Sequence, residues 1–158
     1  MYEIEDRTLV EQPTMVMHGK VKLEDIPTFL GRVYHTVDTQ IRQAGAHVVG
    51  LPFARYRSLD AEYREFEIEA GLPVVVAVAG HGEVEASHLP GGPAAVTIHT
   101  GPYERMEPAY EAVNAWMQAR GVHPEGPAWE VYHTDPNEEP DPATWRTEVV
   151  QPYRPGNH

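Results

Sequence analysis

The chain has 158 residues, enough for a domain with a buried core, and its 41% hydrophobic and 23% charged residues are typical of a globular protein. The formal net charge of −12 argues against direct binding to nucleic-acid phosphates, and the lack of cysteine excludes disulfides and thiol chemistry. No apolar run is long enough to span a membrane and no secretory signal is visible, so we expect a cytoplasmic protein.

The first half of the chain predicts one long helix among strands. Apolar side chains recur at spacings of three and four from Ile26 to Ala44, which indicates a helix over residues 22–44. Pro27 fits only in the first turn of this helix, and Gly45 is a natural stop. The strands that we expect around it cover residues 9–17, 52–57 and 63–70.

The strand predicted at residues 63–70 alternates between two kinds of side chain. Its glutamates share one face, whereas Phe66 and Ile68 share the other. This alternation is typical of a strand with one face in solvent, so we expect a solvated glutamate face. The apolar residues 74–79 fit either a buried strand or an extended crossover, and residues 84–89 predict another short strand.

The second half predicts the same order of elements again. A Pro-Gly-Gly-Pro turn at residues 90–93 precedes a strand. The next helix should begin near Glu107, because Pro108 fits only a first turn, and should stop at Gly121. The strands predicted in this half cover residues 94–100, 128–134 and 145–151.

An internal repeat accounts for this shared order. Residues 45–56 match residues 121–132 without a gap, 76 positions apart (121 − 45), with two glycines, a histidine and a tyrosine recurring in both copies. We therefore expect a single α+β domain over residues 1–158, made of two strand–helix–strand–strand modules at about residues 1–72 and 90–153. In this arrangement antiparallel strands form the sheet, the helices cover one face, and the seam at the pseudo-two-fold axis offers a ligand groove.

One difference between the copies marks a candidate site residue. Glu130 stands where the first copy has Ala54. By a period of two, Glu130 and Tyr132 share one face of their strand and Trp129 lies on the other, so Glu130 faces the groove if Trp129 packs against the helices. A carboxylate beside aromatic rings suits an organic cation, and a carboxylate whose pKa is raised by burial suits a general base. The alternative is a glutamate on a solvated sheet face.

Four aromatic residues are further candidates for the site. Tyr103 lies at a strand-to-helix junction and either lines the groove or anchors the helix. Tyr132 and its repeat partner Tyr56 either contact the ligand or stabilise the fold. Trp145 either packs in the core or lines the ligand groove. The nine histidines lack the spacing of a metal site, and no phosphate-loop motif is present, so we expect neither a metal nor a cofactor.

Several ordered motifs resemble those of a known family. They are Leu89-Pro90-Gly91-Gly92, His99-Thr100-Gly101-Pro102-Tyr103, Trp129-Glu130-Val131-Tyr132 and Thr147-Glu148-Val149. In this order and spacing they resemble the GyrI-like small-molecule-binding domain, which is the effector-binding domain of multidrug-responsive transcription activators. The resemblance covers nearly the whole chain. It implies two strand–helix–strand–strand modules with an aromatic groove between them, a central glutamate at Glu130, and groove-side tyrosines at Tyr103 and Tyr132.

The resemblance also implies a function, for a stand-alone member without a DNA-binding domain. The first expectation is a protein that captures amphipathic, often cationic aromatic compounds, with Glu130, Tyr132, Tyr103, Tyr56 and Trp145 contacting the ligand. One alternative is a hydrolase of reactive cyclopropane-containing natural products, in which Glu130 is the general base and Tyr103 or Tyr132 donates or orients a proton. The other is a module that acts on DNA gyrase or on a transcription regulator as its protein partner.

Overall fold

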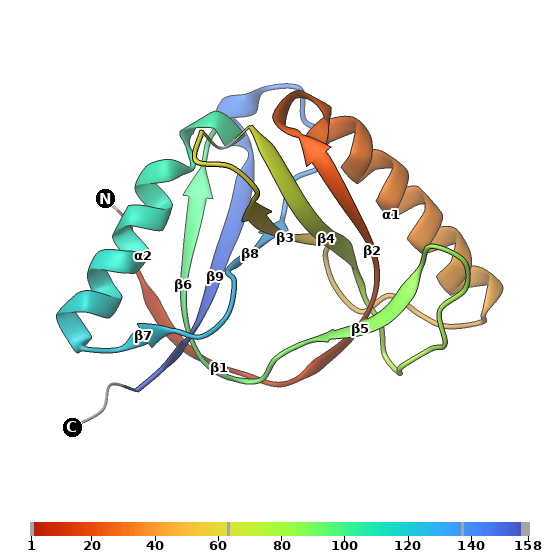
Figure 1. The fold of residues 1–158 in the computed structure, drawn as a ribbon, viewed down its shortest axis with the longest axis horizontal. Coiled ribbons are helices and arrows are strands. Elements are labelled where there is room, and N and C mark those ends of the chain that lie inside the picture. Colours follow the sequence, from red (N-terminus) through yellow and green to blue (C-terminus); the bar gives the residue numbers. More distant parts are fainter. Residues whose placement is uncertain (1, 63, 137, 156–158) are drawn as a thin grey trace. The chain divides into compact units, whose positions relative to one another are not determined.

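A computed structural model of the protein describes residues 2–62, 64–136 and 138–155. The chain divides into two compact units, which we call the first unit (Glu11–Pro90) and the second unit (Met1–Val10 with Gly91–His158). Each unit is an antiparallel sheet with one α-helix, which confirms the α+β class and the duplicated module (Figure 1). Within the described residues, neither α-helix is both long enough and apolar enough to cross a membrane.

The sheet of the first unit has the strand order β3-β4-β2-β5, and each neighbouring pair is antiparallel. Helix α1 (Ile26–Gln43) begins with Pro27 in its first turn and ends just before Gly45, whose φ of 72° is left-handed, as the sequence predicts. The helix lies against the sheet (Figure 1). Its buried apolar stripe consists of Phe29, Val33, Val37 and Ile41. The strands are β2 (Gln12–Lys22), β3 (Phe53–Ser58), β4 (Glu65–Pro73) and β5 (Glu85–Leu89).

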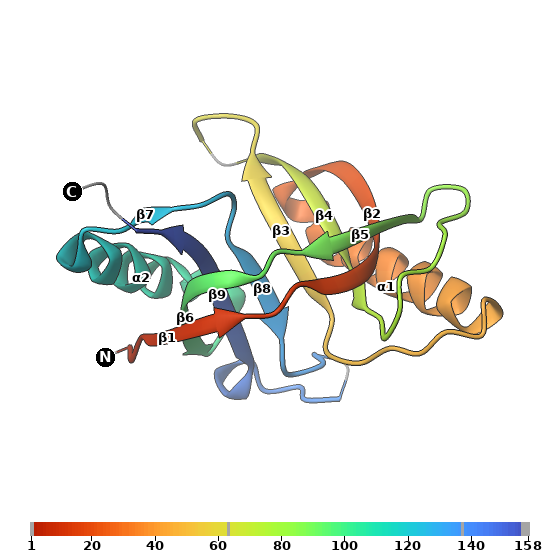
Figure 2. The same cartoon turned by 90° about the horizontal axis from the view of Figure 1, so that it is seen from below.

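The sheet of the second unit has the order β1-β6-β9-β8, with the short strand β7 also paired to β9. Helix α2 (Glu107–Arg120) follows the 3-10 turn η2 (Tyr103–Arg105) and lies against β6 and β9 (Figure 2). The helix begins and ends where the sequence predicts. The core between helix and sheet contains Ala95, Met106, Ala109, Val113, Met117 and Val149. The strands are β1 (Glu5–Leu9), β6 (Gly92–Thr100), β7 (His123–Pro124), β8 (Trp129–Tyr132) and β9 (Arg146–Arg154).

The two repeats exchange their first strands. Strand β1 precedes β2 along the chain but pairs with β6 of the second unit. Strand β5 precedes β6 but pairs with β2 of the first unit. The strand predicted over residues 9–17 is therefore confirmed from Gln12 onward as part of β2, but its start is wrong, because Leu9 ends β1, which belongs to a different unit.

The first unit differs from the prediction in two further places. The apolar residues 74–79 form no regular strand; Val74 makes an isolated bridge with Val48, while Val75 and Val76 are exposed. The glutamate face of β4 is not simply solvated, because Glu69 is largely shielded from water and accepts a hydrogen bond from Arg55 of the neighbouring strand. Tyr63, the first residue of the strand predicted there, lies outside the described residues.

The strand ladders show which residues of the two units correspond. Ala54 pairs with Ala70 on β4, and Glu130 pairs with Val149 on β9, so the predicted correspondence of Ala54 and Glu130 fits the ladders. In the sequence, Met15-Val16-Met17-His18 resembles Val96-Thr97-Ile98-His99, which predicts that His18 and His99 correspond, but the ladders contradict this match. Counted from Ala54 and Glu130 along the ladders, Glu69 of the first unit corresponds to Glu148 of the second. The β2 partner of Glu69 is His18, whereas the β6 partner of Glu148 is Ile98, so His18 corresponds to Ile98 and not to His99.

Candidate functional site

Glu130 lies on the face of its sheet that helix α2 covers. Its ladder partner Val149 belongs to the core beneath α2, and Tyr132 follows two residues later on the same face. Trp129 is buried on the opposite face, paired with Val150. The sequence predicted that Glu130 faces away from the helices if Trp129 packs against them. Trp129 lies on the face opposite α2, so this condition is not met and Glu130 lies on the helix-covered face.

Two tyrosine hydroxyls donate hydrogen bonds to the Glu130 carboxylate. Tyr132 reaches Oε1 at 2.9 Å from the same strand. Tyr110 reaches Oε2 with a short hydrogen bond from α2. Sequence reasoning missed Tyr110, because its position on the apolar stripe of α2 indicated only a core residue; the signal that could have found it is that its hydroxyl needs a partner when the ring is packed.

The carboxyl group of Glu130 is partly shielded from water, and this burial raises its pKa above the ordinary value. The hydrogen bonds from Tyr110 and Tyr132 and the nearby imidazole of His99 act in the opposite direction. Glu130 makes no ion pair with a basic side chain in the described part of the chain. The site thus holds a carboxylate with two hydroxyl donors and no ion-pair partner among the described residues.

Aromatic rings lie next to this carboxylate. Tyr103 packs its ring edge-on against Tyr132, with 5.8 Å between the ring centroids, and lies 4.9 Å from the Trp145 ring. Trp145 is itself fixed by a 2.8 Å hydrogen bond from its indole nitrogen to the carbonyl of Glu139. Burial raises the pKa of Tyr103, and the negative charges of Glu130 and Asp135 add to this effect.

A buried histidine supports the turn that carries Tyr103. His99 is 3% exposed, and its Nε2 lies 3.0 Å from the carbonyl oxygen of Pro102. Because a carbonyl only accepts, this nitrogen donates, and Nδ1 on the other side of the ring is hydrogen-bonded to the hydroxyl of Tyr2 at 2.8 Å. His99 therefore ties the N-terminal segment to the residue directly before Tyr103.

The structure brings four of the five predicted ligand residues together in the second unit, namely Glu130, Tyr132, Tyr103 and Trp145. The fifth, Tyr56, belongs to the first unit, where it packs edge-on against Phe66 at 6.2 Å. The roles of all five in binding or catalysis stay predictions.

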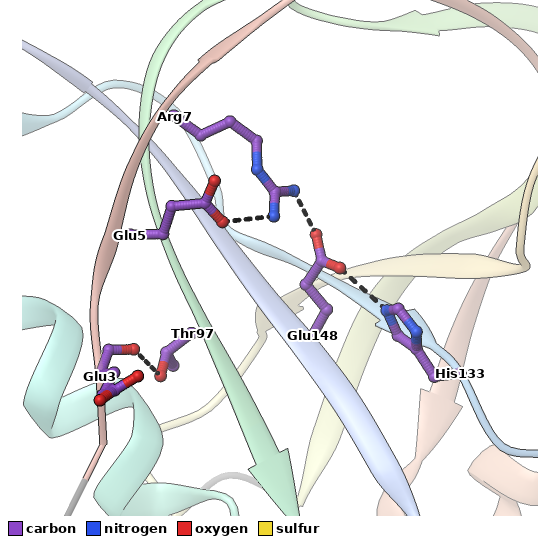
Figure 3. Close-up of polar contacts among 6 residues, drawn as sticks. All are labelled: Glu3, Glu5, Arg7, Thr97, His133 and Glu148. Carbon is purple, nitrogen blue, oxygen red and sulfur yellow. Dashed lines mark hydrogen bonds and ion pairs between the residues drawn. The ribbon is translucent and has the colours of Figure 1, made fainter.

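The other face of the same sheet carries a separate charged network. Arg7 donates to Glu148 at 2.7 Å and also pairs with Glu5 (Figure 3). His133 lies 2.9 Å from the second oxygen of Glu148 (Figure 3). Glu148 is thus a shielded glutamate with basic partners, in contrast to Glu130, and it offers a matched control for charge removal.

The raised pKa of Glu130 predicts that the stability of the second unit falls as the pH rises. The folded protein holds this proton more tightly than the ordinary pKa of 4.5 implies, so the contribution to stability is complete below pH 4.5 and is lost as the pH rises through the raised pKa. Glu130→Gln should remove this dependence. Urea unfolding of both proteins, followed by tryptophan fluorescence, tests it, because Trp116, Trp129 and Trp145 all lie in the second unit. Equal pH slopes for the two proteins would contradict the assignment.

Two solved structures that contain EcmrR share this fold. The crystal structure of the EcmrR C-terminal domain matches with a TM-score of 0.85 and 18% identity, covering 98% of this chain and 99% of that one. The chain also matches EcmrR in a cryo-EM complex with DNA, at a TM-score of 0.83 and 19% identity, and there it spans 58% of the EcmrR chain. The TM-scores show that the fold is shared, and at identities this low the likeness shows the fold alone.

Two further structures share the fold. A hydrolase from Listeria innocua matches with a TM-score of 0.73 and 12% identity, over 96% of this chain and 92% of that one. SAV2435 bound to tetraphenylphosphonium matches with a TM-score of 0.62 and 13% identity, over 96% and 94%. A search of curated proteins found no match. A family model, described as the GyrI-like small molecule binding domain, matches residues 2–154, and the chain therefore belongs to the GyrI-like family.

Proposed function

We propose that the second unit binds amphipathic organic cations, often aromatic ones, with Glu130 as the counter-charge. One observation carries this proposal: a shielded carboxylate accepts hydrogen bonds from the hydroxyls of Tyr110 and Tyr132 and makes no ion pair among the described residues. A cation that enters beside it gains charge attraction in a partly desolvated setting, which strengthens the interaction.

The aromatic neighbours of Glu130 support the same ligand class. The Tyr103, Tyr132 and Trp145 rings offer faces for cation–π contacts and apolar surface for an aromatic ligand. Tyr103 is 36% exposed, so part of this aromatic surface is open to solvent. The tetraphenylphosphonium bound by SAV2435, a protein of the same fold, is a lipophilic aromatic cation and makes a suitable first probe.

The proposal is tested by isothermal titration of tetraphenylphosphonium into the wild-type protein and Glu130→Gln, with the ligand recovered afterwards for analysis. Saturable binding that is weakened by the substitution, with the ligand intact, supports a binding module centred on Glu130. Wild-type-like binding by the mutant would overturn the role of Glu130.

A second candidate function, hydrolysis, is favoured by the raised pKa of Glu130. A carboxylate with a raised pKa is a better general base for activating water, and in this proposal Tyr103 or Tyr132, which lie beside it, donates or orients a proton. In this case Glu130→Gln should abolish turnover of a reactive cyclopropane-containing substrate and leave its binding measurable. Substrate loss at the same rate without the protein would exclude this candidate.

A further inference from the structure

One buried hydroxyl near Glu130 has no hydrogen-bond partner. Thr147 has no exposed surface, and its Oγ1 makes no hydrogen bond within the described residues. Buried hydroxyls nearly always have a partner, and leaving one unpaired costs stability, so such a group in a folded protein needs an explanation.

The position of Thr147 places this hydroxyl in the Glu130 site. Thr147 lies on β9 between His99 of β6 and Tyr132 of β8, and all three share the face that α2 covers. The next residue of β9 on this face is Val149, the ladder partner of Glu130. Thr147 is therefore one step along the sheet from the carboxylate.

The neighbours of Thr147 already have partners of their own. Both nitrogens of His99 are used, by Tyr2 and by the Pro102 carbonyl, and the hydroxyl of Tyr132 donates to Glu130. Turning either side chain toward Thr147 would break one of these hydrogen bonds.

Other polar groups around the same part of the sheet are satisfied. Thr97, on the same face of β6, donates to the carbonyl oxygen of Glu3 at 2.8 Å (Figure 3). Glu148, next to Thr147 but on the other face, is bound by Arg7 and His133 (Figure 3). Thr147 thus stands out within a region where polar atoms otherwise find partners.

The first unit shows that this position can hold an aliphatic side chain. The row of the first unit that corresponds to His99–Thr147–Tyr132 is Gly19–Ile68–Tyr56. Ile68 is fully buried, and the Phe29 ring fills the space above Gly19. The fold therefore does not require a hydroxyl here. In the second unit the same patch carries three polar replacements: His99 for Gly19, Thr147 for Ile68 and Glu130 for Ala54.

We propose that Thr147 is a ligand-binding residue whose hydroxyl hydrogen-bonds an uncharged polar group of the molecule held at Glu130. This inference rests on the proposed cation-binding function and narrows its ligand class to organic cations that also carry a hydroxyl, ether, carbonyl or amide group. Since Thr147 is fully buried, a neighbouring side chain must move first. Tyr103 is suited to this, because its side chain is held by ring contacts with Tyr132 and Trp145 and by no hydrogen bond in the described part of the chain.

A matched pair of cations tests the proposal: tetraphenylphosphonium and (4-hydroxyphenyl)triphenylphosphonium, which differ by one hydroxyl. Isothermal titration of the wild type should show a preference of about three- to tenfold for the hydroxylated cation, the size expected of one hydrogen bond. Thr147→Val should lose this preference while still binding tetraphenylphosphonium. Thr147→Ser, which retains a hydroxyl, should restore the preference.

Thermal unfolding separates a ligand contact from a structural role. Thr147→Val removes an unpaired buried hydroxyl, so it should raise the melting temperature of the free protein while it lowers affinity for the hydroxylated cation. Thr14→Val is the control, because Thr14 is the other buried hydroxyl without a partner in the described residues and lies in the first unit. It should raise the melting temperature and leave the binding preference unchanged.

The outcomes distinguish this inference from the function on which it rests. A wild type without the preference, or a Thr147→Val protein that keeps it, overturns the role of Thr147. If Glu130→Gln still weakens both cations in that case, the proposed function stands. If the wild type binds neither cation, or if Glu130→Gln binds both as well as the wild type does, the proposed function fails and this inference fails with it.

Discussion

Glu130→Gln is expected to weaken the binding of tetraphenylphosphonium by about 1–2 kcal/mol, or roughly five- to thirtyfold. The substitution keeps the shape of the side chain and its capacity to accept from Tyr110 or Tyr132, but it removes the charge that attracts the cation. For the wild type, affinity should rise with pH above 4.5, because the cation needs the ionised carboxylate. This dependence is opposite in sign to that of stability, and it should be absent from the mutant.

Glu148→Gln is the matched control for this experiment. It removes the same charge from a shielded glutamate in the same unit, but on the face of the sheet that carries Arg7 and His133. We expect its cation affinity to remain close to that of the wild type, although its stability should fall because two basic groups lose their partner. An equal loss of affinity in both mutants would mean that overall negative charge, rather than Glu130, attracts the ligand.

Gly71→Ala is expected to destabilise the first unit by about 3 kcal/mol or more. Gly71 lies on β4, an interior strand, where a Cβ atom would come within 1.9 Å of the carbonyl oxygen of Met15 and 2.9 Å of the Cα of Val16. Both contacts are with backbone, so no side-chain rotation can relieve them. Urea unfolding followed by far-ultraviolet circular dichroism is the appropriate measurement, because no tryptophan lies in the first unit.

Gly31→Ala provides a control of opposite sign in the same unit. Gly31 lies inside α1, and a Cβ atom there would meet no other atom within 4 Å. Alanine favours a helix interior over glycine by about 1 kcal/mol, so this variant should be more stable than the wild type. If Gly71→Ala were as stable as Gly31→Ala, the close approach of β4 to β2 would be contradicted.

The helices could be predicted closely from the sequence because their signals are local. The apolar spacing, Pro27 and Gly45 place α1, and Pro108 and Gly121 place α2, as the structure confirms. Each of these signals acts within one or two turns of the chain, where the backbone constraint of proline or glycine outweighs distant contacts.

The site could be predicted only in part, since it depends on which face each strand buries. Period two groups Glu130 with Tyr132, but it cannot tell which of the two faces meets a helix. Trp129 is apolar and is buried, yet it lies on the face opposite α2. A sheet buried on both faces gives no signal in a single strand that would distinguish them.

Contacts between residues distant in sequence also could not be predicted. Tyr110 and Glu130 are brought together by the packing of α2 on the sheet, and the distance between them along the chain carries no periodic signal. The mismatch of His18 and His99 arose because short apolar strands align almost equally well when shifted by one residue, and a one-residue shift exchanges the two faces.

The exchange of first strands has a consequence for the synthesis of this protein on the ribosome. Strand β1 emerges well before the strand that it pairs with, because the partner of Glu5 is Val96, which is made 91 residues later (96 − 5). At typical elongation rates this interval is about 5–20 s. During that time β1 is exposed and unpaired. Among the strands of the N-terminal half, β1 is therefore the last to reach its native position. The acidic residues Glu3, Glu5 and Asp6 keep this waiting segment polar, which limits its pairing with other nascent chains.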